Sequence, residues 1–321
     1  MEDDIPPLSP ITAAPRAKLA PLRIKTDVDP TSRESLSAST TSKKQATALK
    51  ILDEYIPESP FDKTVNILRA MIKHIPTLGK EEVFTDIAKE PDLAELSRHY
   101  MNFVVFPLRA KGNSTPAAWS LSSRSFEDSL PEGEFESQQA RLKKDCLRRD
   151  NGCCLISGLL DPSFDSDPSK ETIETEAAHI VPFAMASFSE VQRPWAEQIW
   201  SEIHRLFPDA KDFKPEHIND PSNCLTLEAT LHKQFGKLNW ALELTATFHA
   251  ESLGKNTFVA HDGRYPLPRP SLLNLHAAVA HIYHASGMSD DFEQILEART
   301  QITCLAPDGS TPIAQVLMMV I

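Results

Sequence analysis

Three residues in three local contexts carry side chains that together could hydrolyse a phosphodiester. His179 follows a run of β-favouring residues, Asn223 follows Asp-Pro-Ser, and His232 lies in a short apolar stretch. Hydrolysis of this charged bond needs a base that activates water and a cation that neutralises the charge developing on the phosphate. A neutral imidazole suits the base, so His179 is the candidate general base. His232 is the candidate metal ligand, and Asn223 the residue that fixes either the loop or the ring of His179.

Two short segments around the first histidine predict a β-hairpin. Residues 173–180 favour a strand and stop before Pro182, so this strand would deliver His179 at its end. Residues 153–156, followed by a Ser-Gly turn, predict the second strand. Along the first strand, alternation places one set of side chains on the face opposite to His179: Glu174, Glu176, Ala178 and Ile180.

A helix is predicted for residues 226–235, because three apolar side chains repeat there at four-residue spacing. Thr226 can cap this helix, and Gly236 can end it in a left-handed conformation. His232 would project from the helix, with Glu228 one turn before it on the same side. Two strands and a helix would therefore bring the two histidines together.

Three motifs, in this order, resemble the HNH nuclease domain: Glu176-Ala-Ala-His-Ile-Val-Pro182, Asp220-Pro-Ser-Asn223 and Leu231-His232-x-x-Phe235. A Cys-x-x-Ser-Gly turn that begins at Cys154 is similar to the variety found in many fungal proteins, and the resemblance covers roughly residues 138–246. It implies an α+β fold class with a ββα-metal core of the HNH (His-Me finger) type, to which further strands and helices are added. It also implies a divalent cation, Mg²⁺, Mn²⁺ or Zn²⁺, and cleavage of nucleic acid, DNA in preference to RNA.

Two positions depart from the usual pattern of that family. Ala178 stands where many members have a metal-binding Asp or His, and Gly236 stands where related domains often supply another acid or His. A single ligand, His232, would hold a divalent ion poorly. Glu176, about 7 Å from Ala178 along the strand at roughly 3.3 Å per residue, and Glu228 are therefore candidate ligands. If both are only solvated surface charges, we expect a catalytically degenerate protein that keeps the scaffold for binding.

The candidates also have ordinary structural explanations. A histidine at a strand end or on a half-apolar helix is often simply hydrogen-bonded or packed, and Asn223 is a good turn residue. Cys154-x-x-Ser157 resembles half of a zinc knuckle, but no CxxC pair completes it, and five scattered cysteines fit reduced thiols. His276, His281 and His284 lie in an apolar helical stretch, where packing is the commoner role.

Charge and composition bound the possible partners. The net charge of −12 offers no general attraction to a polyanion, so any basic footprint must be local. Residues 137–149 predict a helix with five basic residues against one acid, although a solvated helix surface is the commoner explanation. The candidate nucleic-acid contacts are Arg141, Lys143, Lys144, Arg148 and Lys233. Protein partners are not specified by the sequence.

The remaining sequence predicts the organisation of the chain. With 41% hydrophobic residues, 321 residues can bury one or two cores. No apolar run approaches the roughly 20 residues of a membrane span, and the first residues lack the features of a signal peptide. We therefore expect an intracellular protein, nuclear or cytoplasmic, without a membrane partner. Composition and periodicity predict consecutive regions: a disordered tail (1–44), a helical domain (45–110), a linker (111–136), an HNH nuclease-like domain with C-terminal helices (137–298) and a C-terminal extension (299–321).

Individual elements are also predicted outside the motifs. Helices are expected from residue 44 to the proline at 57, at 61–75, 80–89, 92–109, 193–207 and 271–286, and from residue 290. Strands that extend the sheet are expected at 240–245 and 257–260, separated by a turn at 253–254.

Overall fold

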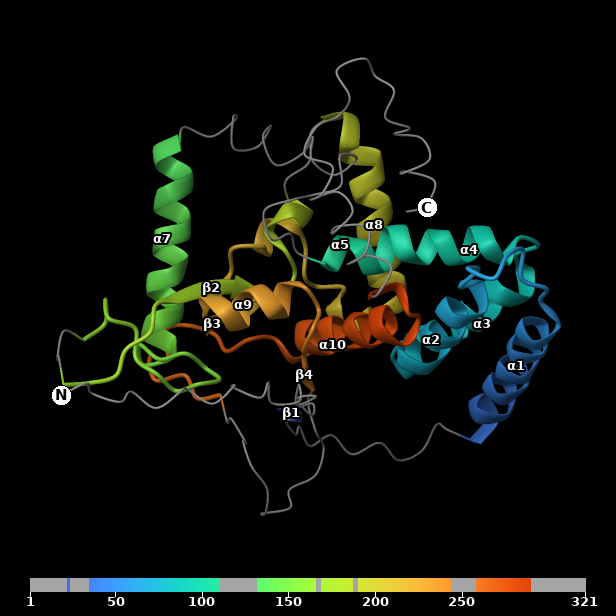
Figure 1. The fold of residues 1–321 in the computed structure, drawn as a ribbon, viewed down its shortest axis with the longest axis horizontal. Helices are drawn as coiled ribbons and strands as arrows, with labels where there is room; N and C mark the ends of the chain where they lie inside the picture. Colours follow the sequence, from blue (N-terminus) through green and yellow to red (C-terminus); the bar gives the residue numbers. More distant parts are fainter. Residues whose placement is uncertain are drawn as a thin grey trace, which may run out of the picture.

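The computed structural model describes residues 22–23, 35–109, 132–165, 169–186, 190–243 and 258–289. Its helices are α1 (Ser35–Glu54), α2 (Thr64–His74), α3 (Thr77–Lys89), α4 (Leu93–Tyr100), the π-helical turn η1 (Met101–Val105), α5 (Phe106–Leu108), α7 (Glu132–Arg149), α8 (Arg193–Leu206), α9 (Ala229–Gly236) and α10 (Pro270–Ala285). Its strands are β1 (Leu22–Arg23), β2 (Thr175–His179), β3 (Cys224–Glu228) and β4 (Leu242–Glu243). Single 3₁₀ turns lie at Phe183–Ala186, Glu190–Gln192, Pro208–Ala210, Pro215–His217 and Pro221–Asn223. The fold class is therefore α+β, as predicted (Figure 1).

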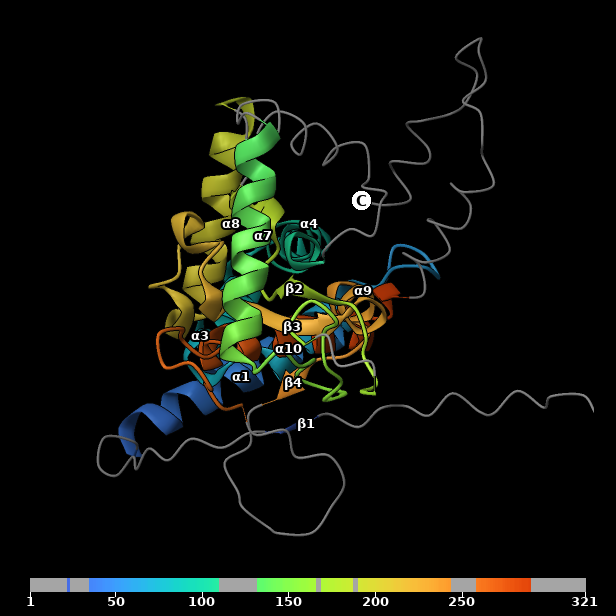
Figure 2. The ribbon, with the colours of Figure 1, turned by 90° about the vertical axis from the view of Figure 1, so that its left-hand side faces the viewer.

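An antiparallel pair of strands, β2 and β3, carries the first histidine. Thr175 lies opposite Glu228 at one end of the pair and His179 opposite Cys224 at the other. Helix α9 follows β3 directly and packs on both strands, while α7 also packs on both (Figure 2). Ala177 contacts the apolar side of α7, whereas Glu176 contacts α9, so the two helices cover opposite faces of the pair.

The predicted hairpin between residues 153–156 and 173–180 is wrong. Residues 153–156 form a turn instead, in which the amide of Gly158 donates to the carbonyl of Cys154 at 2.9 Å. Gly158 has a φ of +73°, which a glycine adopts without strain. The amide of Leu155 donates to the carbonyl of Thr226 at 2.8 Å, so this turn lies against β3. The partner of β2 comes from more than 40 residues further along the chain.

The predicted helix at 226–235 begins later than expected. Thr226 is buried within β3, where its hydroxyl donates to the carboxylate of Asp150 at 2.6 Å and caps nothing. Glu228 occupies the N-cap position of α9. Gly236 is the last residue of α9, and the left-handed conformation falls on Leu238, with a φ of +61°. Apolar spacing that suits both a strand and a helix explains the misplaced start.

One buried apolar cluster extends from α1 to α10. Helix α10 packs against α2, and α8 packs against α3 and η1, so the helices before residue 110 share a core with the HNH-like region. The expected boundary at residue 44 falls inside α1, and the expected linker end at residue 136 falls inside α7. In α1, Ala48 and Leu52 are buried, whereas Ile56 lies beyond the helix and is exposed.

Of the strand predicted at 240–245, residues 240–243 are described and contain β4, which pairs in parallel with β1 and not with β2 or β3. Residues 258–260 form no strand, contrary to the prediction. Helices α8 and α10 confirm the predictions at 193–207 and 271–286, and α2 to α5 confirm the helices predicted between 61 and 109. The expected turn at 253–254, the helix from 290 and the extension at 299–321 lie outside the described residues.

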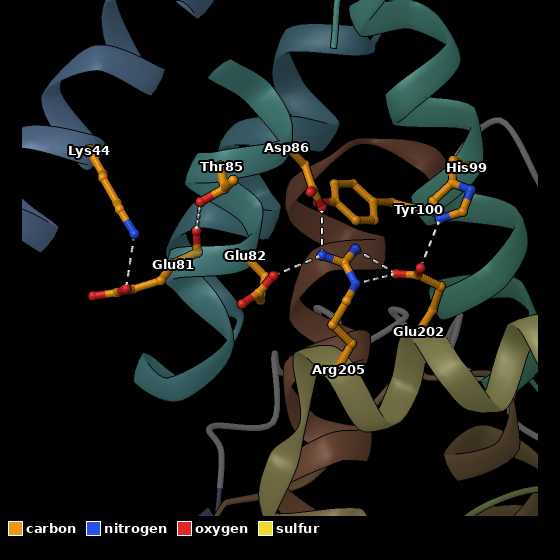
Figure 3. A network of polar contacts seen from close by, with 9 residues as sticks. All are labelled: Lys44, Glu81, Glu82, Thr85, Asp86, His99, Tyr100, Glu202 and Arg205. Carbon is orange, nitrogen blue, oxygen red and sulfur yellow. Dashed lines mark hydrogen bonds and ion pairs between the residues drawn. The ribbon is translucent and has the colours of Figure 1, made fainter. Parts of the chain in front are cut away.

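A polar network fastens α8, which lies between β2 and β3 in the sequence, to α3 and α4 (Figure 3). The Arg205 guanidinium binds the carboxylates of Glu202 at 2.6 Å and Asp86 at 2.8 Å. The hydroxyl of Tyr100 donates to Asp86 at 2.7 Å, and His99 lies 3.5 Å from Glu202. Partial burial lowers the pKa of Arg205, but its carboxylate partners raise that pKa overall. Burial raises the pKa of Glu202, but its contacts with His99 and Arg205 lower that pKa overall. We call these five residues the Arg205 network.

Candidate active site

Glu176 and His232 meet on the α9 face of the strand pair. A carboxylate oxygen of Glu176 accepts a hydrogen bond from Nδ1 of His232. Both side chains are open to solvent, with 53% of Glu176 and 32% of His232 exposed. Since the carboxylate has no proton to give, Nδ1 is the donor, and Nε2 of His232 stays available for another partner.

His179 lies at the end of β2 and is half-buried. Its Nε2 is 3.1 Å from Oδ1 of Asn219, and its ring lies against Phe183 at a centroid distance of 6.0 Å. Burial lowers the pKa of His179 to about 4; the Asn219 hydrogen bond opposes this shift, and the charge of His232 adds to it. His179 is therefore neutral at pH 7. His179 ends the same strand that carries Glu176, the hydrogen-bond partner of His232.

Asn223 acts on the backbone of the loop. Its side chain is fully buried, and its Oδ1 accepts from the amide of Val181 at 2.9 Å. Its Nδ2 donates to the carbonyls of Val181 at 3.0 Å and Ile218 at 2.9 Å. Of the two roles expected for Asn223, the geometry supports fixing the loop, because these bonds go to the main chain and none to the ring of His179.

The other ligand candidates lie differently. Ala178 is fully buried opposite Leu225, so nothing at that position can reach an ion. Glu228 ends β3 opposite Thr175, and the carboxylate that contacts His232 is that of Glu176. The usual motif has a metal-binding residue where this chain has Ala178. Here the carboxylate that contacts His232 belongs instead to Glu176, two residues earlier.

The basic residues do not form one continuous surface. Lys143 lies 3.3 Å from a carboxylate oxygen of Asp161, and Arg148 donates to the hydroxyl of Tyr265 at 3.2 Å. Arg141 and Lys144 are exposed on α7, which covers the face of the strands opposite to α9, whereas the exposed Lys233 neighbours His232 on α9 itself.

Arg149, the last member of the basic run, is fully buried and serves the fold. Its guanidinium pairs with Asp150 at 2.7 Å and donates to the carbonyls of Pro221 at 2.6 Å and Cys224 at 2.9 Å. These two carbonyls flank Asn223, so Arg149 holds the start of β3 from the α7 side. Nothing in a run of five basic residues indicates which one is buried.

The donor set fits an ion that keeps most of its own water. Within the described ranges, no group of three or more His, Cys, Asp or Glu side chains could hold a metal. Glu176 and His232 offer two donors, which suits Mg²⁺ or Mn²⁺ completed by water and phosphate oxygens, but not a structural zinc ion with four side-chain ligands.

The three histidines of α10 make separate contacts. Nε2 of His276 lies 3.2 Å from the carbonyl of Phe235, and Nε2 of His284 lies 2.8 Å from that of Leu238. His281 hydrogen-bonds to Glu243 and stacks on His74 at a centroid distance of 4.9 Å. They hold α10 to the chain around β4 and do not converge.

Comparison with protein families identifies one match: the model of the HNH endonuclease family covers residues 154–243. This stretch contains β2, β3 and α9 with all three motifs, and so confirms the HNH resemblance. Comparisons with curated proteins and with solved structures gave no match. Among the helices that the structure describes, none is long and apolar enough to cross a membrane.

Proposed function

We propose that this protein is a metal-dependent endonuclease of the HNH type that hydrolyses phosphodiester bonds in nucleic acid at a ββα-metal site formed by β2, β3 and α9. The observation that carries the proposal is the solvent-open carboxylate–imidazole pair, Glu176 and His232, whose carboxylate lies on the strand that ends at the neutral imidazole of His179. The match to the HNH endonuclease family over the same stretch supports it.

His179 takes the role of general base, because at pH 7 its ring is unprotonated and can accept a proton from water. A pKa of about 4 describes the site without substrate. A phosphate anion bound nearby favours the imidazolium and so raises the pKa toward the working pH. Substrate binding would therefore strengthen the base when it is needed.

Glu176 and His232 would hold the divalent ion, which when bound supplies positive charge to the phosphate and to the leaving oxygen. Their exposure leaves room for a phosphate group beside them. Asn223 contributes indirectly, because its three backbone hydrogen bonds keep the loop that follows His179 in place.

Substrate affinity is expected to be weak. The net charge of −12 repels a polyanion, and Lys233 is the basic residue next to His232. Delivery by a partner that itself binds nucleic acid would overcome this repulsion.

The alternative function is a catalytically degenerate scaffold that binds without cutting. One observation favours it: Ala178 is buried at the position where many HNH enzymes carry a ligand, and among the described residues the site offers two side-chain metal donors and no third.

Nicking of supercoiled plasmid and cleavage of a labelled RNA, each with Mg²⁺, Mn²⁺ or EDTA, separate the two functions. We expect His179→Ala to lower the rate by about 100-fold or more, since a positioned base contributes about 10² to 10⁴. His232→Ala should weaken ion binding measured by calorimetry, and excess Mn²⁺ should restore part of its activity. His261→Ala, at an exposed histidine, is the matched control and should behave as wild type. Wild-type protein that binds no divalent ion and cuts neither substrate would establish the scaffold function.

A further inference from the structure

We propose that Asn219 is the positioning residue of the site, which fixes the ring of His179 so that Nδ1, and not Nε2, receives the proton from water. This inference rests on the proposed function, in which His179 is the base. Asn219 lies outside the roles expected from the three motifs, and its contact with His179 joins positions 40 residues apart.

The chemistry of one hydrogen bond carries the assignment. Oδ1 of Asn219 lies 3.1 Å from Nε2 of His179, and an amide oxygen can only accept. Nε2 must therefore carry the hydrogen. Since a neutral imidazole has a single N–H, the lone pair is on Nδ1. A ring free to exchange tautomers would present the correct nitrogen for only part of the time.

A second asparagine explains why Asn219 points at the ring. The buried amide of Asn223 binds both backbone groups of Val181, two residues after His179, and the carbonyl of Ile218, one residue before Asn219. The amide of Ile180 also donates to the carbonyl of Asn223 at 2.7 Å. One side chain thus fastens together the two segments that carry His179 and Asn219.

The two asparagines should respond differently to substitution. Asn223 is fully buried with three backbone hydrogen bonds, so its loss disturbs the loop and the fold. Asn219 is partly exposed, and its loss should alter the ring of His179 while the loop stays in place. Asn219 is thus the position at which ring orientation can be tested separately from folding.

The direct test is ¹⁵N NMR of the full-length protein labelled at histidine, with the His179 signals identified by their absence in His179→Gln. At pH 7 we expect a single neutral tautomer with the hydrogen on Nε2. In Asn219→Ala the two tautomers should both be populated. A wild-type ring with its hydrogen on Nδ1, which is the result if the amide nitrogen of Asn219 faces the ring, would overturn the proposal.

The kinetic test compares Asn219→Ala with Asn219→Asp, which keeps the accepting oxygen. We expect Asn219→Ala to lower kcat by about 10- to 100-fold with little change in KM or in ion affinity, the usual cost of losing a partner that orients a ring. Asn219→Asp should keep most of kcat. Asn239→Ala is the control, because Asn239 is exposed and donates to Gln234, and it should match wild type.

The pH dependence of kcat/KM is a further test, because it would not change if Asn219 had only a structural role. Within the described residues, the charged group that acts on His179 is His232 on α9, which is hydrogen-bonded to Glu176, and both are retained in these variants. A carboxylate at position 219 favours the imidazolium, so the acid limb of kcat/KM should move to higher pH in Asn219→Asp. Equal rates and limbs in all three proteins would overturn the proposal. Absence of cleavage by wild type, with the expected NMR tautomer, would instead reject the proposed function and leave the Asn219 orientation standing.

Discussion

The Arg205 network and the His179 site use the same kinds of side chain in opposite ways. In the network, Arg205, Glu202 and Asp86 are 28%, 14% and 26% exposed, and the guanidinium binds both carboxylates (Figure 3). At the site, Glu176 and His232 are 53% and 32% exposed, and one hydrogen bond is all that joins them in the described structure. Charges that satisfy each other inside a helix junction hold the fold. The charges of Glu176 and His232, which remain half open to water, are available for a ligand.

The largest expected effect breaks the network. Arg205→Ala removes the cation that neutralises Glu202 and Asp86, so we expect the free energy of unfolding to fall by about 3 kcal/mol. Urea unfolding measures this loss. Cleavage per folded molecule should be unchanged, because the network does not touch the site. Arg193→Ala, whose partner Glu190 is 88% exposed, should cost less than about 1 kcal/mol.

The next effect concerns His179 and pH. Its pKa in the folded protein, about 4, lies below the ordinary value of 6.5, so the unfolded chain binds a proton more readily. Above pH 6.5 both states are neutral, and stability falls as pH drops from 6.5 to 4. His179→Gln should therefore become more stable relative to wild type over this window, by about 3 kcal/mol at pH 4. Denaturant titrations at pH 7, 5.5 and 4.5 test this, and a constant difference would contradict it.

Glu176→Gln tests whether the solvent-open pair of Glu176 and His232 binds an ion or only contributes to the fold. Removal of the carboxylate charge should weaken Mn²⁺ binding and lower the cleavage rate by about tenfold or more, since it removes one of the two proposed ligands. The melting temperature should stay within about 2 °C, because an exposed pair contributes little to stability. Glu174→Gln, one residue before β2 and exposed, is the control. Unchanged ion binding alongside a lower melting temperature would assign Glu176 to the fold.

The smallest effect concerns the exposed basic residues. Replacement of Lys233 by Ala should reduce the slope of log affinity against log salt by about one unit if it contacts a phosphate. The same change at Arg141 and Lys144 should reduce it less, because α7 covers the face opposite to α9. Fluorescence anisotropy with a labelled duplex measures both slopes. Lys50→Ala on α1, ion-paired with Glu54 at 3.8 Å, should leave the slope unchanged.

Local patterns predicted much of this structure. Helices α2, α8 and α10 follow from apolar periodicity and from prolines near their ends, and Glu176 was one of two glutamates expected to assist His232. The partner of β2 was missed because residues 153–156 are near in sequence, whereas β3 arrives after a 44-residue connection. Such long-range pairing leaves no local signal, and the spacing of Leu227 fits a strand or a helix.

The candidate site shows the same limit at the level of single residues. Asn219 and Asn223 are both turn residues in one short segment, and their sequence context does not say which meets the ring of His179. Only the folded structure shows that Asn219 contacts the ring of His179 and that Asn223 binds the backbone. Likewise, the buried guanidinium of Arg149 binds carbonyls more than 70 residues away in the sequence. The basic run around Arg149 therefore does not indicate that this residue is buried.

Because the core is continuous, we expect that the HNH-like region does not fold when it is separated from the rest of the chain. A fragment limited to residues 154–243 would lack Arg149, which holds the start of β3. In such a fragment, the side of α8 that packs on α3 and η1 would also be exposed to solvent. Exposed apolar surface of this kind leads to aggregation. The smallest fragment that keeps this fold must therefore include helices from both sides of the matched stretch.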